Sequence, residues 1–286
     1  MSDVTVIGLG AMGSAIARRF IAGGFSVSVW NRTHSRAATL AEEGATPVAD
    51  LEQAIRASNK ILICVIDYAA WSSLCARPGI AKAFAGRSVT QLTGGTPSDA
   101  TRVSDWMCAH DTTYLDGAIM GYPGDLGEKM QVLVAGPQAA FQDWVPLLNC
   151  LAGDLRHVGD NIRAAKTLDM ALLARFVGLK FCAMHGAHIC ESEGVDLMQL
   201  AGLLPDGDNA KTMIETVATD DFSLRLGSAS VDVAAGFWQA AQIQAQERGI
   251  NSELPDLFAS WCKRGIDRGW GDDDNAGLIR VLRDKA

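Results

Sequence analysis

The alternation of apolar and polar positions is most regular over residues 4–36. Residues 4–7 form a short apolar run, residues 8–13 are rich in glycine, and apolar positions over residues 15–21 recur at helical spacing. Residues 26–30 then alternate as expected for a strand. This order predicts a strand, a tight turn, a helix and a second strand, which together form the β-α-β unit of a parallel sheet.

The alternation of strands and helices continues to about residue 150. Short apolar runs predict strands at residues 60–65, 88–92, 113–120 and 131–135. Helical runs are predicted at residues 37–43, 51–57, 98–110 and 141–150. The expected fold class is therefore α/β, with an N-terminal Rossmann-type, doubly wound parallel sheet. Such sheets bind ligands at the carboxyl ends of their strands, here after Val65 and Leu92.

The pattern changes near residue 159. Residues 161–193 contain no proline, carry apolar residues at helical spacing, and predict one long interdomain helix. Further helical runs follow without a convincing strand, at residues 197–204, 232–247 and 254–268. We expect a nucleotide-binding Rossmann domain, the interdomain helix, and an all-helical dimerisation and substrate domain, over residues 1–160, 161–193 and 194–286. A helix of that length spans roughly 50 Å, so we expect it to pack against a second copy of itself.

The glycine-rich turn has the spacing GxGxxG at Gly8, Gly10 and Gly13. In a dinucleotide-binding unit the first glycine allows the sharp turn, the second lets the pyrophosphate approach the backbone, and the third lets the helix pack closely on its strand. The pyrophosphate then faces the helix N-terminus. The predicted cofactor-binding residues of this turn are Gly8, Leu9, Gly10, Ala11, Met12 and Gly13.

The end of the second strand indicates which dinucleotide binds. An NAD-binding unit places an acidic residue there to hold the ribose 2′-hydroxyl, but this chain has Asn31, Arg32 and Thr33, followed by Arg36. Two arginines and a hydroxyl suit a 2′-phosphate, so the sequence predicts NADPH. Alternatively, Arg32 and Arg36 form a solvated face at the start of a helix. Further cofactor contacts are expected from Cys64, Val65, Thr93 and Thr96.

Composition and charge argue against membrane, disulfide-linked, zinc-binding and nucleic-acid-binding proteins. The chain has 286 residues, 48% hydrophobic and 20% charged, with no apolar run long enough to span a membrane. Its seven cysteines are scattered without a CxxC pair, which is typical of reduced thiols and not of disulfides or a zinc site. The net charge of −8 argues against a nucleic-acid partner. Because the start also lacks a secretory signal, we expect a cytoplasmic protein without a metal site.

Several segments give the chain a family resemblance. They are GLGAMG at residues 8–13, VWNRT at 29–33, LTGGTP at 92–97, LDGAIMGYPGDLG at 115–127, LDMALL at 168–173 and GWGDDDNAGLIRVL at 269–282. In this order they resemble the imine reductase and reductive aminase family, a branch of the β-hydroxyacid dehydrogenase superfamily. The resemblance implies an NADPH-dependent oxidoreductase that reduces a cyclic imine, or an imine formed from a ketone and an amine. It also implies a homodimer that exchanges a helical domain like that of 6-phosphogluconate dehydrogenase and shares its active clefts.

Two residues of the long helix match different branches of that superfamily. Asp169 matches the acid of imine reductases, whereas Lys166 lies in a segment like the one that holds the catalytic lysine of the dehydrogenases. A carboxyl group near the substrate nitrogen stabilises an iminium cation or passes a proton, and burial raises its pKa towards a useful value. Lys166 would instead assist at a carbonyl or hydroxyl oxygen. Alternatively, the two residues form an ordinary helix-surface pair.

Three functions are compatible with these residues. The chain is either an imine reductase, a β-hydroxyacid dehydrogenase that uses Lys166, or a nucleotide-binding protein that keeps the fold without turnover. Some reductive aminases have an asparagine where Gly94 stands and a tyrosine where Val177 stands, so coupling of ketones with amines is left undecided. Trp238 also suits core packing. The predicted substrate contacts are Met120, Tyr122, Leu173, Phe176 and Trp238.

Overall fold

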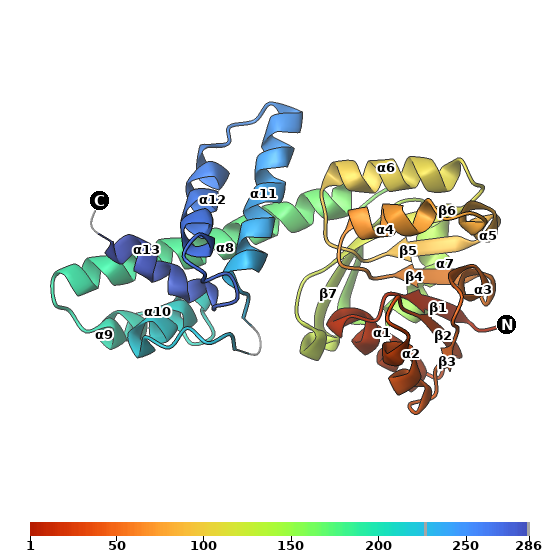
Figure 1. Ribbon diagram of the computed structural model, residues 1–286, viewed down its shortest axis with the longest axis horizontal. Helices are drawn as coiled ribbons and strands as arrows, with labels where there is room; N and C mark the ends of the chain where they lie inside the picture. Colours follow the sequence, from red (N-terminus) through yellow and green to blue (C-terminus); the bar gives the residue numbers. More distant parts are fainter. Residues whose placement is uncertain (226–227, 285–286) are drawn as a thin grey trace. The chain divides into compact units, whose positions relative to one another are not determined.

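Figure 1 shows the computed structural model of the chain, which describes residues 1–225 and 228–284. The chain forms two compact units, Met1–Asp169 and Met170–Ala286. The division falls inside the long helix α8, Ala164–Ser192. Residues 226–227 and 285–286 of the predicted helical domain lie outside the described residues.

The first unit is built on one eight-stranded sheet in the order β3-β2-β1-β4-β5-β6-β7-β8. Its strands are β1 Val4–Ile7, β2 Val27–Trp30, β3 Thr46–Pro47, β4 Lys60–Ile63, β5 Ser88–Gln91, β6 Thr113–Ile119, β7 Gly127–Ala135 and β8 Ala152–His157. Neighbouring strands pair in parallel except β6 and β7, which are antiparallel. The order of the first six strands is usual in doubly wound dinucleotide-binding sheets, so the predicted fold class is confirmed.

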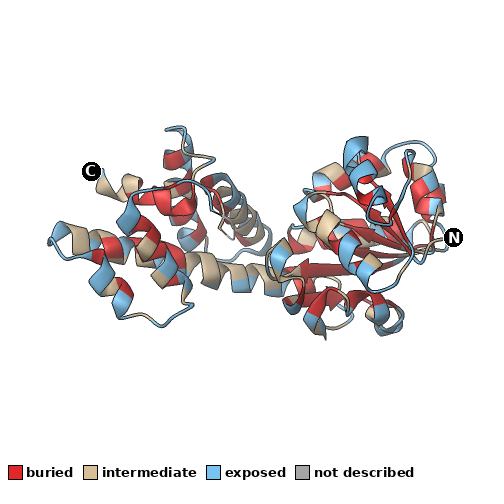
Figure 2. Ribbon diagram, turned by 90° about the horizontal axis from the view of Figure 1, so that it is seen from below, coloured by how far each residue is buried: buried red, intermediate tan, exposed pale blue. Residues whose placement is uncertain are grey.

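Helices cover both faces of this sheet (Figure 1). One buried cluster joins the sheet to α1 Ala11–Ala22, α2 His34–Ala41 and α7 Gln138–Leu148. The cluster on the other face involves α3 Leu51–Arg56, α4 Tyr68–Cys75, α5 Ile80–Phe84 and α6 Pro97–Cys108. Phe20 and Trp144 are fully buried in the first cluster, and Trp71 and Phe84 in the second. Figure 2 shows the sheet as a buried layer between these helices.

The structure also differs from the predicted elements. The sequence pattern predicts neither β3, which has two exposed residues, nor β8, a largely half-exposed strand without an apolar run. It also does not predict α4, α5 or the antiparallel direction of β7. The long helix begins at Ala164 and not at Asn161, because the Asn161 side chain accepts a hydrogen bond from the backbone N–H of Arg163 and forms a turn before the helix.

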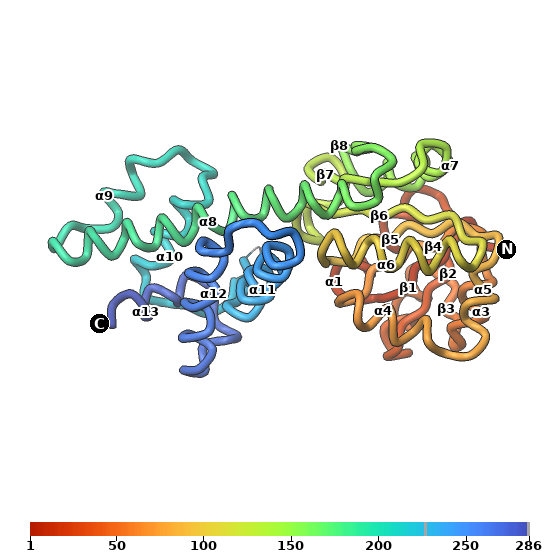
Figure 3. Tube along the Cα trace, turned by 90° about the horizontal axis from the view of Figure 1, so that it is seen from above, coloured from red at the N-terminus to blue at the C-terminus, as the bar shows by residue number. Residues whose placement is uncertain are grey.

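The regular secondary structure in the described part of the second unit is helical, apart from an isolated bridge between Ser230 and Asp274. Beyond α8 they are α9 Leu197–Gly202, α10 Asn209–Thr219, α11 Val231–Arg248, α12 Glu253–Ile266 and α13 Ile279–Arg283, with the 3-10 turn η2 Asn275–Leu278 (Figure 3). The sequence pattern predicts α9, α11 and α12 but not α10 or α13. No helix of the described chain combines the length and apolar character needed to cross a membrane.

An aromatic cluster forms the centre of the second unit. The ring centroids of Phe181, Trp238 and Phe258 lie 4.7 to 6.0 Å apart. Trp238, which the sequence suggests as a substrate contact, is 1% exposed and packs in this core. Its burial therefore corresponds to the core-packing alternative, because the ring is surrounded by other side chains of its own unit.

The glycine turn between β1 and α1 predicts two different outcomes for glycine-to-alanine changes. A Cβ on Gly13 would lie 2.0 Å from the carbonyl oxygen of Gly8, whereas a Cβ on Gly10 would have no heavy atom within 4 Å. Gly13→Ala should lower the free energy of unfolding by about 1–3 kcal/mol, as overpacking does. Gly10→Ala should cost less than about 1 kcal/mol, the effect of a poorer N-cap residue. Urea unfolding of both variants checks this, and equal midpoints would contradict it.

Candidate functional site

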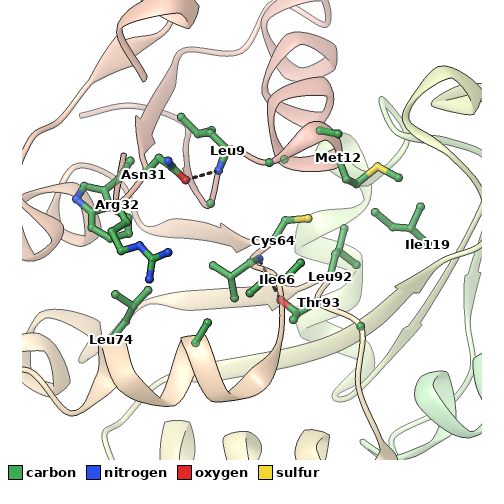
Figure 4. A pocket seen from close by; sticks show the side chains of 18 of the residues that line it. Leu9, Met12, Asn31, Arg32, Cys64, Ile66, Leu74, Leu92, Thr93 and Ile119 are labelled. Carbon is green, nitrogen blue, oxygen red and sulfur yellow. Dashed lines mark hydrogen bonds between the residues drawn. The ribbon is translucent and has the colours of Figure 1, made fainter. Parts of the chain in front are cut away.

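A cavity of about 610 Å³ lies where β1, β2, β4 and β5 end (Figure 4). This is the edge at which doubly wound sheets bind their ligands. Nearly all predicted cofactor residues line it: Gly8, Leu9, Gly10, Ala11, Met12, Gly13, Asn31, Arg32, Thr33, Arg36, Cys64, Val65 and Thr93. The two residues from the long helix that the sequence singles out, Lys166 and Asp169, line it as well.

The glycine turn forms one wall of the cavity without side chains. Gly8 has φ +95°, a conformation that favours glycine, and a Cβ there would lie 2.3 Å from the carbonyl oxygen of Cys64. The empty space beside Gly10 leaves the N-terminus of α1 open to the cavity. The close packing and the open helix end fit a pyrophosphate group, which takes backbone N–H groups as donors.

Asn31 joins the ends of β1 and β2 at another wall (Figure 4). Its Oδ1 accepts a hydrogen bond of 3.0 Å from the backbone N–H of Leu9, and its Nδ2 donates to the carbonyl of Thr33. Arg36 donates to the carbonyl oxygen of Leu9 at 3.4 Å. Arg32 is exposed and forms no ion pair with any residue the structure describes. It therefore keeps a cationic group available at the cavity.

Among the lining residues that the sequence-based prediction does not include, two carry a hydroxyl or a guanidinium group. Ser73 in α4 and Arg77 just beyond that helix line the cavity together with the predicted arginines. The sequence gives no clear signal for them, because α4 itself is not predicted. They add a hydroxyl group and a third guanidinium to the polar lining.

The loops after β4 and β5 are connected across the cavity. The backbone N–H of Val65 donates to Oγ1 of Thr93 at 3.3 Å. Burial raises the pKa of the Cys64 thiol to about 12, so the thiol is neutral at physiological pH. Thr96 is not among the residues that line the cavity, because its side chain and backbone N–H bond Asp99 in the capping box of α6.

Lys166 lines the cavity from a fully buried position. Its side chain is fully buried, and Nζ donates to the carbonyl oxygens of Thr93 and Gly117, both at 2.5 Å. The same ammonium lies 3.5 Å from Oδ1 of Asp116, a carboxyl group that is also fully buried. Tyr68 and Tyr114 donate to the other oxygen of Asp116. Burial raises the pKa of Asp116, whereas the charge of Lys166 and the hydrogen bonds from the two tyrosines lower it. Sequence spacing gives no signal for this cluster, because four separate segments supply it.

Asp169 has a different environment from Lys166. It is half-buried, and desolvation raises the pKa of its carboxyl group to about 6, although the positive charge of Lys166 lowers that pKa and the negative charge of Asp116 raises it. The described residues contain no ion pair between Asp169 and Lys166, because the lysine contacts Asp116 instead. The ordinary helix-surface pair therefore does not form.

The predicted substrate contacts occupy different places. Met120 packs against the buried cluster of Leu133, Ala135 and Ala165. Tyr122 precedes the 3-10 turn η1 Pro123–Asp125.

Leu173 and Phe176 are half-buried residues of α8 in the second unit. The Lys180 ammonium lies 4.7 Å from the centroid of the Phe176 ring. Within the described part of the chain, no group of three or more His, Cys, Asp and Glu side chains could hold a metal ion.

Comparisons with known proteins agree with this geometry. The family model for the NAD binding domain of 6-phosphogluconate dehydrogenase matches residues 3–159. The chain is 29% identical to an NADPH-dependent reductive aminase of Aspergillus oryzae, with 98% of this chain and 97% of the relative covered. A solved imine reductase from Myxococcus stipitatus in complex with NADP+ is 30% identical, with a TM-score of 0.69 over 98% of this chain and 100% of that one.

Two further solved structures differ in whether they share the family or only the fold of this chain. An imine reductase from Pseudomonas sp. is 31% identical, with a TM-score of 0.65 over 99% of each chain. A 3-hydroxyisobutyrate dehydrogenase from Salmonella typhimurium has a TM-score of 0.82 over 98% of this chain and 99% of that one, but 20% identity, which is a likeness of fold alone. The predicted resemblance is thus confirmed: the chain belongs to the imine reductase and reductive aminase family of the β-hydroxyacid dehydrogenase superfamily.

Proposed function

We propose that this chain is an NADPH-dependent imine reductase that transfers hydride to the C=N bond of a cyclic imine or iminium. The observation that carries the proposal is the contrast between two residues of α8. Asp169 lines the cavity with a carboxyl pKa of about 6, whereas the Lys166 ammonium is already bonded to the protein. The relatives named reductive aminase and imine reductase support the same activity.

The cavity fits a dinucleotide with a 2′-phosphate. The open backbone beside Gly10 suits the pyrophosphate, and the arginine side chains at positions 32, 36 and 77 suit the phosphate on the ribose. Asn31 gives this end of the site a neutral amide in place of the carboxylate that would repel a phosphate. Bound NADPH supplies the hydride, and the residues of the chain position it and handle the proton.

Asp169 is suited to act on the substrate nitrogen. With a pKa of about 6, its carboxyl group exists in both protonation states near neutral pH. The protonated form donates a proton to an imine nitrogen, and the ionised form stabilises an iminium cation. The half-buried position strengthens either interaction, because less water competes with it. We therefore assign Asp169 the catalytic role.

Lys166 is poorly placed for carbonyl or hydroxyacid chemistry. An ammonium has three hydrogens; Thr93 and Gly117 accept hydrogen bonds from two of them, and Oδ1 of Asp116 lies 3.5 Å from the nitrogen. A substrate oxygen would have to compete with these two carbonyl groups and with the Asp116 carboxyl group for the ammonium. This geometry favours the imine reductase over the dehydrogenase alternative. The remaining alternative is a nucleotide-binding protein without turnover. An assay of imine reduction with NADPH tests it, because such a protein would show no turnover.

The proposal also includes a homodimer and a cytoplasmic location. We assign cofactor binding to residues 1–160, and dimer contacts to the helix at residues 161–193 with the helical domain at 194–286. Apolar side chains of α8 support a homodimer with shared clefts, since Leu172 is 43%, Leu179 39% and Ile189 54% exposed in the single chain. Leu173 and Phe176 are then expected to face substrate from these helices. A cytoplasmic location fits the free cysteines.

Cofactor preference follows from Arg32. Arg32→Ala should weaken NADPH binding by about 1–3 kcal/mol, the value of a charge-assisted hydrogen bond, and leave NADH binding nearly unchanged. Gly10→Ala is the matched comparison, because crowding the pyrophosphate should weaken both cofactors alike. Dissociation constants from fluorescence titration check both variants. An equal loss for NADPH and NADH in Arg32→Ala would show that Arg32 does not contact the phosphate.

Asp169→Asn should lower kcat for a cyclic imine by about 10²-fold or more, the scale of a positioned acid. The change keeps the size of the side chain, so NADPH affinity should stay the same. Glu193→Gln, which neutralises an exposed acid just beyond α8, is the control and should leave kcat unchanged. Steady-state kinetics with 1-pyrroline and NADPH measures these effects, and full activity of Asp169→Asn would remove the role assigned here.

The homodimer should bury more than roughly 2,000 Å², as permanent assemblies do. Leu179→Glu places a charge on the exposed apolar face of α8 and should shift the protein towards monomer, with loss of activity. Thr39→Glu adds the same charge on an exposed position of α2 and should leave the dimer intact. Sedimentation equilibrium at micromolar concentration measures the oligomeric state of the wild type and of both variants. A stable monomer that retains full activity would rule out shared clefts.

A further inference from the structure

A cluster of buried polar side chains surrounds the Lys166 ammonium beside the cavity. Lys166, Asp116 and Gln91 are fully buried, and Tyr68 and Tyr114 are each 3% exposed. Removing two charges from water costs several kcal/mol for each ion, and well-packed apolar residues are often at least as stable. Stability alone therefore gives little reason for an ion pair in this place.

The two oxygens of Asp116 have separate partners. Oδ2 accepts hydrogen bonds from both phenols, from Tyr68 on α4 and from Tyr114 at 2.7 Å on the same strand as Asp116. Oδ1 has no hydrogen-bond partner within the described chain and faces the Lys166 ammonium at 3.5 Å. The two tyrosines thus fix the rotation of the carboxylate, and the free oxygen is directed at the lysine.

We propose, on the basis of the imine reductase function above, that Asp116 is a positioning residue: fixed by Tyr68 and Tyr114, it holds the Lys166 ammonium against the carbonyl groups of Thr93 and Gly117 and balances its charge beside Asp169. Lys166 then completes the wall of the cavity but does not bind substrate. The charges of Lys166 and Asp116 oppose each other, so their net electrostatic effect on the Asp169 carboxyl group is small.

The charges that act on Asp169 come from two elements. Lys166 lies one turn earlier on α8 and attracts the ionised carboxylate, whereas Asp116 on β6 repels it. The phenols of Tyr68 and Tyr114 and the nearby Cys64 thiol are neutral at physiological pH, because burial raises the pKa of each. Because the two charges act in opposite directions, desolvation has the largest effect on the pKa of Asp169. Removal of either charge should therefore shift its titration, in opposite directions.

The test compares two single variants with the double variant. Asp116→Asn removes the repulsion, so the pKa of Asp169 should fall by about one unit, the size expected for a neighbouring charge. Lys166→Met removes the attraction, so that pKa should rise by a similar amount. In the double variant Asp116→Asn with Lys166→Met both effects cancel, and the pKa should return close to the wild-type value. If Asp116 does not balance the charge of Lys166 beside Asp169, these opposite shifts are not expected.

Two readouts are needed. The pH dependence of kcat/KM for 1-pyrroline gives the inflection due to Asp169, while the ionisation of the substrate itself contributes equally in every variant. Carbon-13 NMR titration of the Asp169 carboxyl group, assigned with Asp169→Asn, gives the same pKa without turnover. If the wild type reduces no imine, the proposed function fails, but the NMR titration still decides the role of Asp116.

Two results would overturn the inference. One is that both single variants shift the Asp169 titration in the same direction, and the other is that neither shifts it. If Asp116→Asn does not fold because it leaves a buried ammonium unpaired, the double variant compared with Lys166→Met gives the same contrast. The Asp169 pKa should then be lower in the double variant than in Lys166→Met, and equal values in these two would also overturn the proposal.

Discussion

Lys166 lies in the first turn of α8, and its ammonium donates to backbone carbonyls at the end of β5 and within β6. These bonds fasten the start of the long helix to the sheet. The cost of burying an ammonium makes the attachment specific, because alternative positions of the helix would leave the charge without acceptors. Asp169 follows one turn later, so its place at the cavity depends on this attachment. The register of the helix and the position of the acid are set by the same contacts.

The other end of the site depends on a backbone constraint. Gly8, Gly13 and the carbonyl group of Cys64 lie closer together than any side chain would allow. This packing brings the start of α1 next to the end of β4 and leaves a wall made of main-chain atoms. This main-chain wall and the half-buried carboxyl group of Asp169 line the same cavity. In the proposed function the wall holds the pyrophosphate of the cofactor, and the carboxyl group acts on the substrate.

The sequence predicts the parts of this structure that depend on local spacing. The glycines of the turn, the polar residues after β2 and the apolar strands β1, β2, β4, β5 and β6 all follow from short-range patterns. The interactions of Lys166 with Asp116, and of Asp116 with Tyr68, join residues about fifty positions apart. No periodicity carries such information. Arg77 is missing from the sequence-based prediction because α4, the helix before it, is not predicted, although the buried residues Tyr68, Trp71 and Leu74 of that helix recur at helical spacing. Trp238 shows that a large apolar residue alone does not distinguish a pocket from a core.

If Asp169 acts as proposed, its carboxyl pKa of about 6 has a consequence for the range of imines that the site reduces. A strongly basic imine reaches the enzyme already protonated, and an ionised carboxylate then pairs with it. A weakly basic imine arrives neutral and needs the protonated acid. Because the same side chain supplies both forms within a narrow pH interval, the acidity of the medium selects between substrate classes. The most favourable pH of this enzyme is therefore a property of each substrate–enzyme pair, and it moves with the basicity of the nitrogen being reduced.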